Sequence, residues 1–194
     1  MAFWIDSHCH FSDLPDQDQL PEVLSRAKQN GISKFLQGGV GPEDWERQLR
    51  MNQKYPEIIP CFGLHPYWVS SHSDEDCEEA LNLLAKLLLQ SAGIGEIGLD
   101  LRPQYKVGFA NQDSEIRQID CFEKQIEMAK VSGKVMVLHL VRAFDEAMQF
   151  FEINGPICRG RQGGLVHGFN GSRKQAEKYL NLDLHLSVGA PLLR

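Results

Sequence analysis

The sequence of 194 residues predicts an α/β fold in which parallel strands alternate with helices. Short runs of apolar and β-branched residues, typical of buried strands, alternate along the chain with longer segments in which apolar residues recur at helical spacing. The connections are short except at 101–113 and 154–163, and no linker or low-complexity tract interrupts the pattern. We therefore expect a single domain over residues 1–194.

The elements follow from this alternation in chain order. Apolar runs predict seven strands, at 3–10, 34–40, 58–66, 92–100, 134–140, 164–169 and 183–189. Helical spacing predicts helices at 20–30, which Gly31 ends, at 43–54, which Pro42 opens, and at 74–91, 114–132 and 142–153. Ser172 and Gln175 have the spacing of a capping box, so a sixth helix is expected to begin there.

The residues at the strand ends distinguish two parallel architectures. A doubly wound nucleotide-binding sheet would carry a glycine-rich turn such as GxGxxG after its first strand, whereas the first strand here continues into HCHFSDLPD. Side chains that bind metals instead follow one strand after another: His8, His10, His65, Glu96, His139 and His167. Barrel enzymes hold their catalytic groups at these strand ends. We predict a (β/α)8 barrel of the TIM type that is incomplete, with the eighth strand missing, because a closed barrel needs roughly 200–250 residues.

Composition limits the classes of function. Hydrophobic residues make up 42% of the chain and the net charge is −6, which argues against wrapping of nucleic acid by a basic surface. No apolar run is long enough to span a bilayer and no signal segment precedes the first strand, so no membrane partner is expected. Five cysteines, at 9, 61, 77, 121 and 158, form no CxxC pair and suit reduced thiols. We expect the protein to be cytoplasmic.

The polar strand ends predict a metal site. His167 alone, between Val166 and Gly168, would suit a hydrogen-bonded core residue. Residues two apart on a strand face the same way, however, so His8 and His10 can converge on one ion. Imidazole nitrogens bind Zn, Mn, Fe or Ni, and Glu96 adds the negative charge that divalent ions need. Because each of these groups would otherwise need a buried partner of its own, a shared site is the better explanation.

Five segments resemble the strand-end motifs of TatD-type metal-dependent deoxyribonucleases, which belong to the amidohydrolase-like barrel superfamily. They are DSHCHF at 6–11, CFGLHP at 61–66, GIGEIGLD at 93–100, VLHLVRA at 137–143 and VHGFNGS at 166–172. The resemblance implies two divalent metal ions, of Zn, Mg or Mn, that activate water for phosphodiester hydrolysis of DNA. It implies that His8 and His10 bind one metal, that Glu96 bridges both, and that His139 and His167 bind the second. His65 would then contact substrate, and both His65 and Glu96 would act in catalysis.

The chain departs from that pattern at its end. The resemblance implies an eighth strand with an ETD-like segment, whose aspartate binds the first metal and handles the proton of the attacking water. The sequence stops at GAPLLR, and no aspartate, Asp183 included, stands in that place. We expect such a chain to keep metal binding and to turn over slowly. Two alternatives remain open: an amidohydrolase-like enzyme acting on C–N or ester bonds, and an inactive chain that only binds metal.

A few further residues are candidates for substrate contact. Arg142, three residues after His139, is predicted to clamp a phosphate oxygen. Tyr67 and Trp68 are candidates for stacking on bases, whereas Trp45 is expected to pack against the sheet. Asp6 and Asp100 are expected to orient ligands or loops.

Overall fold

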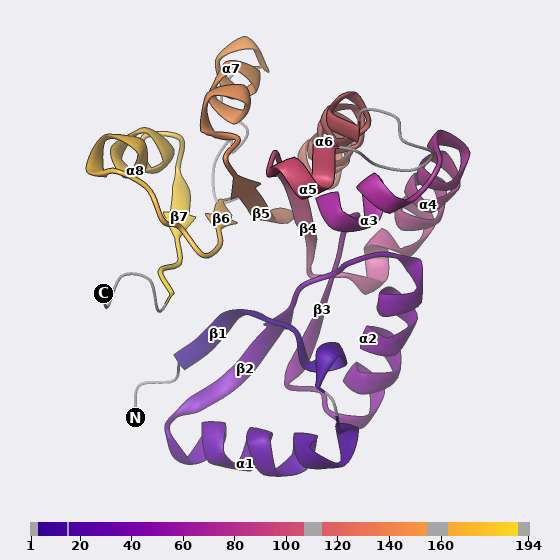
Figure 1. Cartoon of the computed structure of the whole chain (residues 1–194). Helices are drawn as coiled ribbons and strands as arrows, with labels where there is room; N and C mark the ends of the chain where they lie inside the picture. The colour runs from indigo at the N-terminus through magenta and orange to yellow at the C-terminus, as the bar shows by residue number, and fades with distance from the viewer. Residues whose placement is uncertain (1–3, 15, 107–113, 155–162, 190–194) are drawn as a thin grey trace.

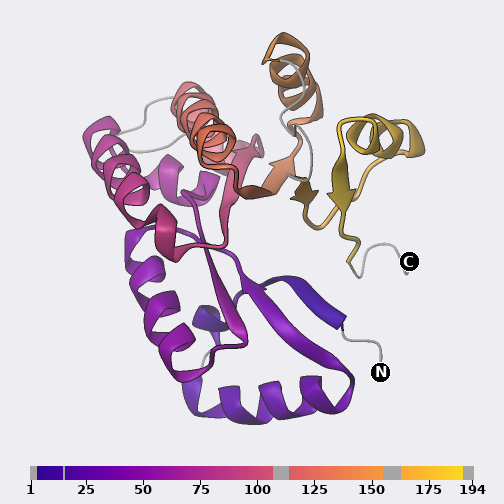
Figure 2. The ribbon, with the colours of Figure 1, turned by 180° about the vertical axis from the view of Figure 1, so that it is seen from behind.

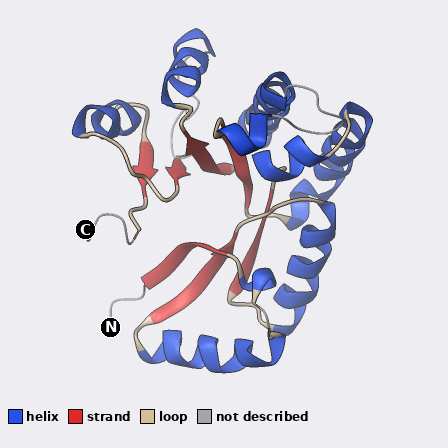
Figure 3. Ribbon diagram, in the orientation of Figure 1, coloured by secondary structure: helices blue, strands red, loops and turns tan. Residues whose placement is uncertain are grey.

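The computed structural model describes residues 4–14, 16–106, 114–154 and 163–189. Its sheet has seven parallel strands: β1 (Trp4–Cys9), β2 (Ile32–Gln37), β3 (Ile58–Phe62), β4 (Gly93–Asp100), β5 (Val135–Val141), β6 (Gly164–Val166) and β7 (Leu184–Leu186). They pair in chain order, from β1 to β7, without the reversal of a doubly wound sheet. The sheet curls into a half-barrel with the helices outside it, and β1 and β7 form its two edges among the described strands (Figures 1 and 3). The predicted incomplete barrel is confirmed.

The helical layer is built from elements that follow each strand. The helices are α1 (Leu20–Gln29), α2 (Pro42–Lys54), α3 (Pro66–Ser71), α4 (Asp74–Leu87), α5 (Pro103–Lys106), α6 (Ser114–Ser132), α7 (Phe144–Asn154) and α8 (Arg173–Leu180). Short 3-10 turns lie at Phe11–Asp13, Gln17–Gln19 and Leu88–Gln90. The capping box predicted for α8 is present, since Ser172 and Gln175 bond to each other's backbone N–H. Gly31 ends α1 with a φ of 83°, the left-handed conformation that favours glycine.

The structure differs from the predicted elements in length and in number. The third strand ends at Phe62 instead of residue 66, because His65 caps α3 and Pro66 occupies its first turn. The predicted helix at 74–91 ends at Leu87 and continues only as a 3-10 turn. The sixth and seventh strands are each three residues long, shorter than their apolar runs. Neither α3 nor α5 was predicted, because both are too short to show a helical period.

β4 is the centre of the molecule, and all eight of its residues are buried. Apolar side chains from the outer face of the sheet pack against the helices in three clusters, which include Ile97 with Phe122, Trp45 with Phe62, and Phe35 with Leu24. The predicted packing of Trp45 is confirmed, since its side chain is fully buried and its indole Nε1 donates to Gly63 O at 3.1 Å. None of the helices in the described part of the chain is long and apolar enough to cross a membrane.

Candidate metal centre

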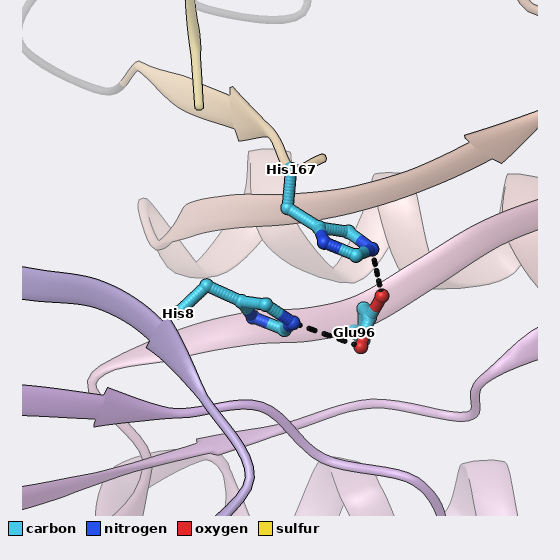
Figure 4. Close-up of side chains that lie close together, drawn as sticks. All are labelled: His8, Glu96 and His167. Atoms are coloured by element: carbon cyan, nitrogen blue, oxygen red, sulfur yellow. Dashed lines mark ion pairs between the residues drawn. The ribbon is translucent and has the colours of Figure 1, made fainter. Parts of the chain in front are cut away.

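Six of the predicted site residues meet at one end of the half-barrel. Glu96 lies on β4, and histidines from the ends of four other strands surround its carboxylate: His8 and His10 from the first, His65 after the third, His139 from the fifth and His167 after the sixth. Figure 4 shows His8 and His167 approaching the two oxygens of Glu96 from different strands. The curl of the sheet thus brings together residues up to 159 positions apart, from His8 to His167.

The two oxygens of Glu96 face different histidines. Oε2 lies 3.2 Å from His8 Nε2 and 3.1 Å from His10 Nε2. Oε1 lies 2.8 Å from His139 Nδ1 and 3.7 Å from His65 Nε2, and it also pairs with His167 Nε2. One carboxylate therefore links two groups of imidazoles, as a bridging ligand would.

Glu96 is 1% exposed, so its environment decides its charge. Burial alone would raise the pKa of this carboxyl, but hydrogen bonds from the surrounding histidines outweigh burial and hold the pKa well below its ordinary value. Burial acts against a charged imidazole as well, yet hydrogen bonds to Asp100 and Glu96 raise the pKa of His139 to about 9. Burial lowers the pKa of His65 to about 3. The cluster therefore holds an ionised carboxylate beside a protonated His139 and a neutral His65.

The positions of the imidazole nitrogens suit binding to a metal ion better than hydrogen bonding to one another. His8 Nε2 and His10 Nε2 are 3.0 Å apart, and His139 Nδ1 lies 3.0 Å from His167 Nε2 and 3.2 Å from His65 Nε2. An imidazole nitrogen carries at most one proton, so His139 Nδ1 cannot donate a full hydrogen bond to Glu96, His167 and His65 at once. The Nδ1 atoms of His8 and His10 are buried without a hydrogen-bond partner in the described part of the chain. Nitrogen and carboxylate donors so placed suit Zn²⁺, Mn²⁺ or a similar ion.

Two sets of three donors each lie within 4.8 Å of one another: His8, Glu96 and His167, and His65, Glu96 and His139. Both sets share Glu96. They differ from the predicted division, in which His8 is grouped with His10 and His139 with His167. His65, predicted to contact substrate, lies close enough to join a metal set. The assignment of each histidine to one ion stays a prediction.

Aspartates hold two of the histidines from outside the cluster. Asp100 Oδ2 lies 3.2 Å from His139 Nε2, so His139 can direct Nδ1 toward Glu96 while Nε2–H donates to Asp100. Arg102 Nε donates to Asp100 Oδ1 at 2.8 Å and fixes that carboxylate. Asp6 Oδ1 accepts a hydrogen bond from the backbone N–H of His8 at 3.1 Å. These contacts support the orienting role predicted for both aspartates.

Sequence reasoning missed several residues that support the site. Gly38 directly follows β2 beside two of the histidines, and a Cβ there would lie 2.5 Å from His8 Cε1 and 3.1 Å from His10 Cε1. Three buried glutamines from the helical layer bond to the main chain near the strand ends: Gln48 to Cys61 N, Gln118 to Asp100 N and Gln125 to Leu64 N. No sequence motif marks these residues; only burial of a polar side chain within an apolar helix face could have suggested them.

The other residues predicted to contact substrate differ in their exposure to solvent. Trp68 is only 8% exposed and stacks on His72 with ring centroids 3.7 Å apart, so its predicted stacking on bases is wrong. Tyr67 is 54% exposed and meets Tyr105 edge to face. Arg142 follows β5 at the surface with a φ of 53° and bonds to none of the six cluster residues in the described chain. The predicted phosphate contact of Arg142 stays a prediction.

A parallel half-barrel whose strand ends present histidines around one bridging carboxylate is the arrangement of a metal-dependent hydrolase. Comparison with known proteins narrows this class. The sequence model of the TatD related DNase family matches residues 5–194. The chain belongs to that family.

Its relatives include hydrolases and nucleases. The chain is 31% identical over 190 residues to YjjV of Escherichia coli K12, an uncharacterized metal-dependent hydrolase, covering 97% of this chain and 69% of YjjV. It is 25% identical to the deoxyribonuclease TATDN3 of Homo sapiens, covering 98% and 69% of the two chains. It is 30% identical to the 3'-5' ssDNA/RNA exonuclease TatD of a Rahnella species, covering 89% and 61%. The crystal structure of YjjV matches with a TM-score of 0.80 at 30% identity, over 98% of this chain and 70% of that one.

Loss of the Asp100 carboxylate should weaken metal binding. In Asp100→Asn, a neutral amide replaces the charged acceptor of His139 Nε2–H and cannot form the ion pair with Arg102, so the contact that fixes the orientation of His139 weakens. We expect the affinity for Mn²⁺ or Zn²⁺, measured by calorimetric titration, to fall by about 10–100-fold. Asp18→Asn, at an exposed position whose side chain bonds to none of the cluster residues in the described part of the chain, is the control and should bind as the unchanged protein does. Equal affinities in the two variants would contradict the orienting role.

Metal binding should also release a proton from His139. Because the pKa of His139 is raised to about 9, this imidazole is protonated at neutral pH in the metal-free protein and must lose its proton to bind an ion. The apparent metal affinity should therefore rise as pH increases toward about 9 and then level off. Titrations at pH 7 in two buffers of different ionisation enthalpy count the protons released. Asp100→Asn should release fewer, and an equal count would show that the proton comes from another group.

Proposed function

We propose that this protein hydrolyses phosphodiester bonds of DNA with the help of two divalent metal ions. The observation that carries the proposal is the shared carboxylate of Glu96, whose oxygens face separate groups of histidines. Family membership and the nuclease names of two relatives support the substrate class. Zn, Mg and Mn are the candidate ions, and rates measured with each of them decide the identity.

In this proposal, Glu96 would hold both ions, His8 and His10 would bind one of them, and His139 and His167 would bind the other. Bound divalent ions would lower the pKa of a shared water and neutralise the charge of the phosphate oxygens. The chain's own residues hold these groups in place: Asp100 keeps the orientation of His139, and Asp6 holds the backbone of His8. Because Glu96 is buried and ionised, it presents both oxygens without a competing proton.

Substrate contact is assigned to His65 and Arg142. His65 Nδ1 accepts the backbone N–H of Tyr67 at 3.0 Å, so its Nε2 is directed into the cluster. A neutral imidazole there can donate a hydrogen bond to a phosphoryl oxygen or a leaving oxygen. Arg142 is exposed after β5, where a guanidinium can meet a phosphate. The bound ions and Arg142 would supply the local positive charge that a chain of net charge −6 needs to hold DNA.

The alternative of C–N bond hydrolysis has less support. Sites of that type often use a carbamylated lysine as the bridge between metals, and the fourth strand, GIGEIGLD, offers Glu96 and no lysine. We also place the protein in the cytoplasm. Four cysteines in the described part of the chain, Cys9, Cys61, Cys77 and Cys121, are free thiols, which suits a reducing compartment.

The activity is tested by metal-dependent hydrolysis of a labelled single-stranded oligonucleotide and of bis(p-nitrophenyl) phosphate, with Zn²⁺, Mn²⁺ or Mg²⁺. In Glu96→Gln the rate should fall by about 10²–10⁴-fold, the range expected when a catalytic carboxylate is lost. Glu152→Gln, an exposed glutamate on α7, is the matched control. Cleavage of p-nitrophenyl acetate or an amide, without any phosphodiester cleavage, would overturn the proposal in favour of the alternative hydrolase.

His65→Gln separates substrate contact from metal binding. If His65 contacts substrate, the variant should bind Mn²⁺ with unchanged affinity in calorimetry while hydrolysis of bis(p-nitrophenyl) phosphate drops by about 10²-fold or more. If His65 instead belongs to a metal set with His139 and Glu96, metal affinity should fall together with the rate. Loss of metal binding in His65→Gln would therefore contradict the assigned role.

A further inference from the structure

A cavity of about 400 Å³ lies between α7 and α8, outside the cluster of histidines around Glu96. The two helices stand next to each other on the outer side of the last three strands (Figures 1 and 2). The cavity is lined by the ends of β5 and β6 and by the first turns of both helices. It therefore lies at the same end of the half-barrel as the metal centre.

The cavity shares two strands with the metal centre. Its wall residue Leu140 directly follows His139, and Val166 directly precedes His167. Because neighbouring side chains of a strand point to opposite faces, the histidines face the inside of the half-barrel while Leu140 and Val166 face the helices. Phe169, two residues after His167, lies in the loop between the two regions. This loop therefore connects the metal centre to the cavity.

Aromatic rings form the apolar part of the wall of the cavity, and the larger share of its exposed lining is polar. Tyr179 is buried, and its ring meets Phe144 and Phe169 edge to face with centroids 5.4 and 6.1 Å apart. Val166 and Leu140 complete the apolar surface. Such a wall suits a flat aromatic ligand.

The polar groups of the cavity are of both signs. Arg142, Asp145 and Glu146 all line the cavity, and the two carboxylates do not suit a simple anion such as phosphate. Gln175 Oε1 is used in the cap of α8, where it accepts from Ser172 N at 2.8 Å. Its side-chain amide N–H groups and the amide of Asn170 have no partner in the part of the chain that the structure describes. A ligand that carries both hydrogen-bond donors and acceptors on a flat ring fits these groups.

We propose that this cavity binds one nucleobase of a single strand whose neighbouring phosphodiester lies at the metal centre. The proposal rests on the proposed function, because it supplies the substrate of that site. The base would stack on the aromatic wall and bond through its polar edge to Asn170, Gln175 and Glu146. The volume is near the lower end of the roughly 300–1,000 Å³ range of small-ligand pockets, which admits a base with its sugar and excludes a duplex.

The test removes the base and the cavity wall separately. A labelled hexadeoxyadenylate with cleavage-resistant phosphorothioate linkages and six versions of it, each with one abasic position, are titrated with the Mn²⁺-loaded protein and followed by fluorescence anisotropy, so that the ions that hold the strand stay in place. With the unchanged protein, one abasic position should weaken binding by about tenfold. The double variant Phe169→Leu with Asn170→Ala should bind the intact strand equally weakly and lose its sensitivity to that position.

Three comparisons make the result decisive. Asn170→Ala alone, at an exposed position that should not affect folding, should show part of the same loss. Gln149→Ala, an exposed residue of α7 that does not line the cavity, should behave as the unchanged protein. The proposal is overturned if no abasic position weakens binding. It is also overturned if the loss of affinity caused by the abasic position and the loss caused by the double variant multiply when the two are combined, because a shared contact can be lost only once.

Hydrolysis of bis(p-nitrophenyl) phosphate, which has no base, separates this proposal from the proposed function. The double variant should hydrolyse it at the rate of the unchanged protein, and a matching fall would show that the substitutions damage the metal centre and would count against a separate base site. If neither protein hydrolyses any phosphodiester with any of the three metals, the proposed function fails. The anisotropy titrations with the cleavage-resistant strands would still decide whether a base occupies the cavity.

Discussion

The buried carboxylate of Glu96 is the constraint on which the rest of this fold depends. An ionised group at 1% exposure is costly unless partners surround it, and its partners come from strands as distant as β1 and β6. β1 is three strands away from β4 in the sheet, so a flat sheet would separate them by about 14 Å. His8 Nε2 nevertheless lies 3.2 Å from Glu96 Oε2. The curl of the sheet and the burial of this charge therefore require each other.

The same constraint explains what could be predicted from the sequence. Polar residues that follow apolar strands are conspicuous, so the pattern alone places His8, His10, His65, Glu96, His139 and His167 at one end of a barrel. The order of parallel strands follows from their alternation with helices. The local sequence could not show how imidazoles divide between two sides of a carboxylate, because that division depends on the curvature of the sheet.

Other features were hidden because their signals are not periodic. Trp68 looks like an exposed aromatic in the sequence, but the short helix α3, capped by His65, turns it into the core. Gly38 could be placed in a strand, yet its need for close contact with two imidazoles appears only when β1 and β2 are paired. Arg102 donates a hydrogen bond to Asp100, two residues before it in the sequence. Such local ion pairs are common on protein surfaces and usually contribute little to stability, so the sequence does not single this one out.

The buried glutamines have a consequence for motion at the site. Gln48 of α2 and Gln118 and Gln125 of α6 accept hydrogen bonds from main-chain N–H groups of Cys61, Asp100 and Leu64. These amides are protected from solvent while the helices stay packed on the sheet, so the packing of the outer layer stabilises the strand ends around the metal centre. Rigidity near the centre of the half-barrel is thus imposed from its periphery, and the ligands are held in position before any ion arrives.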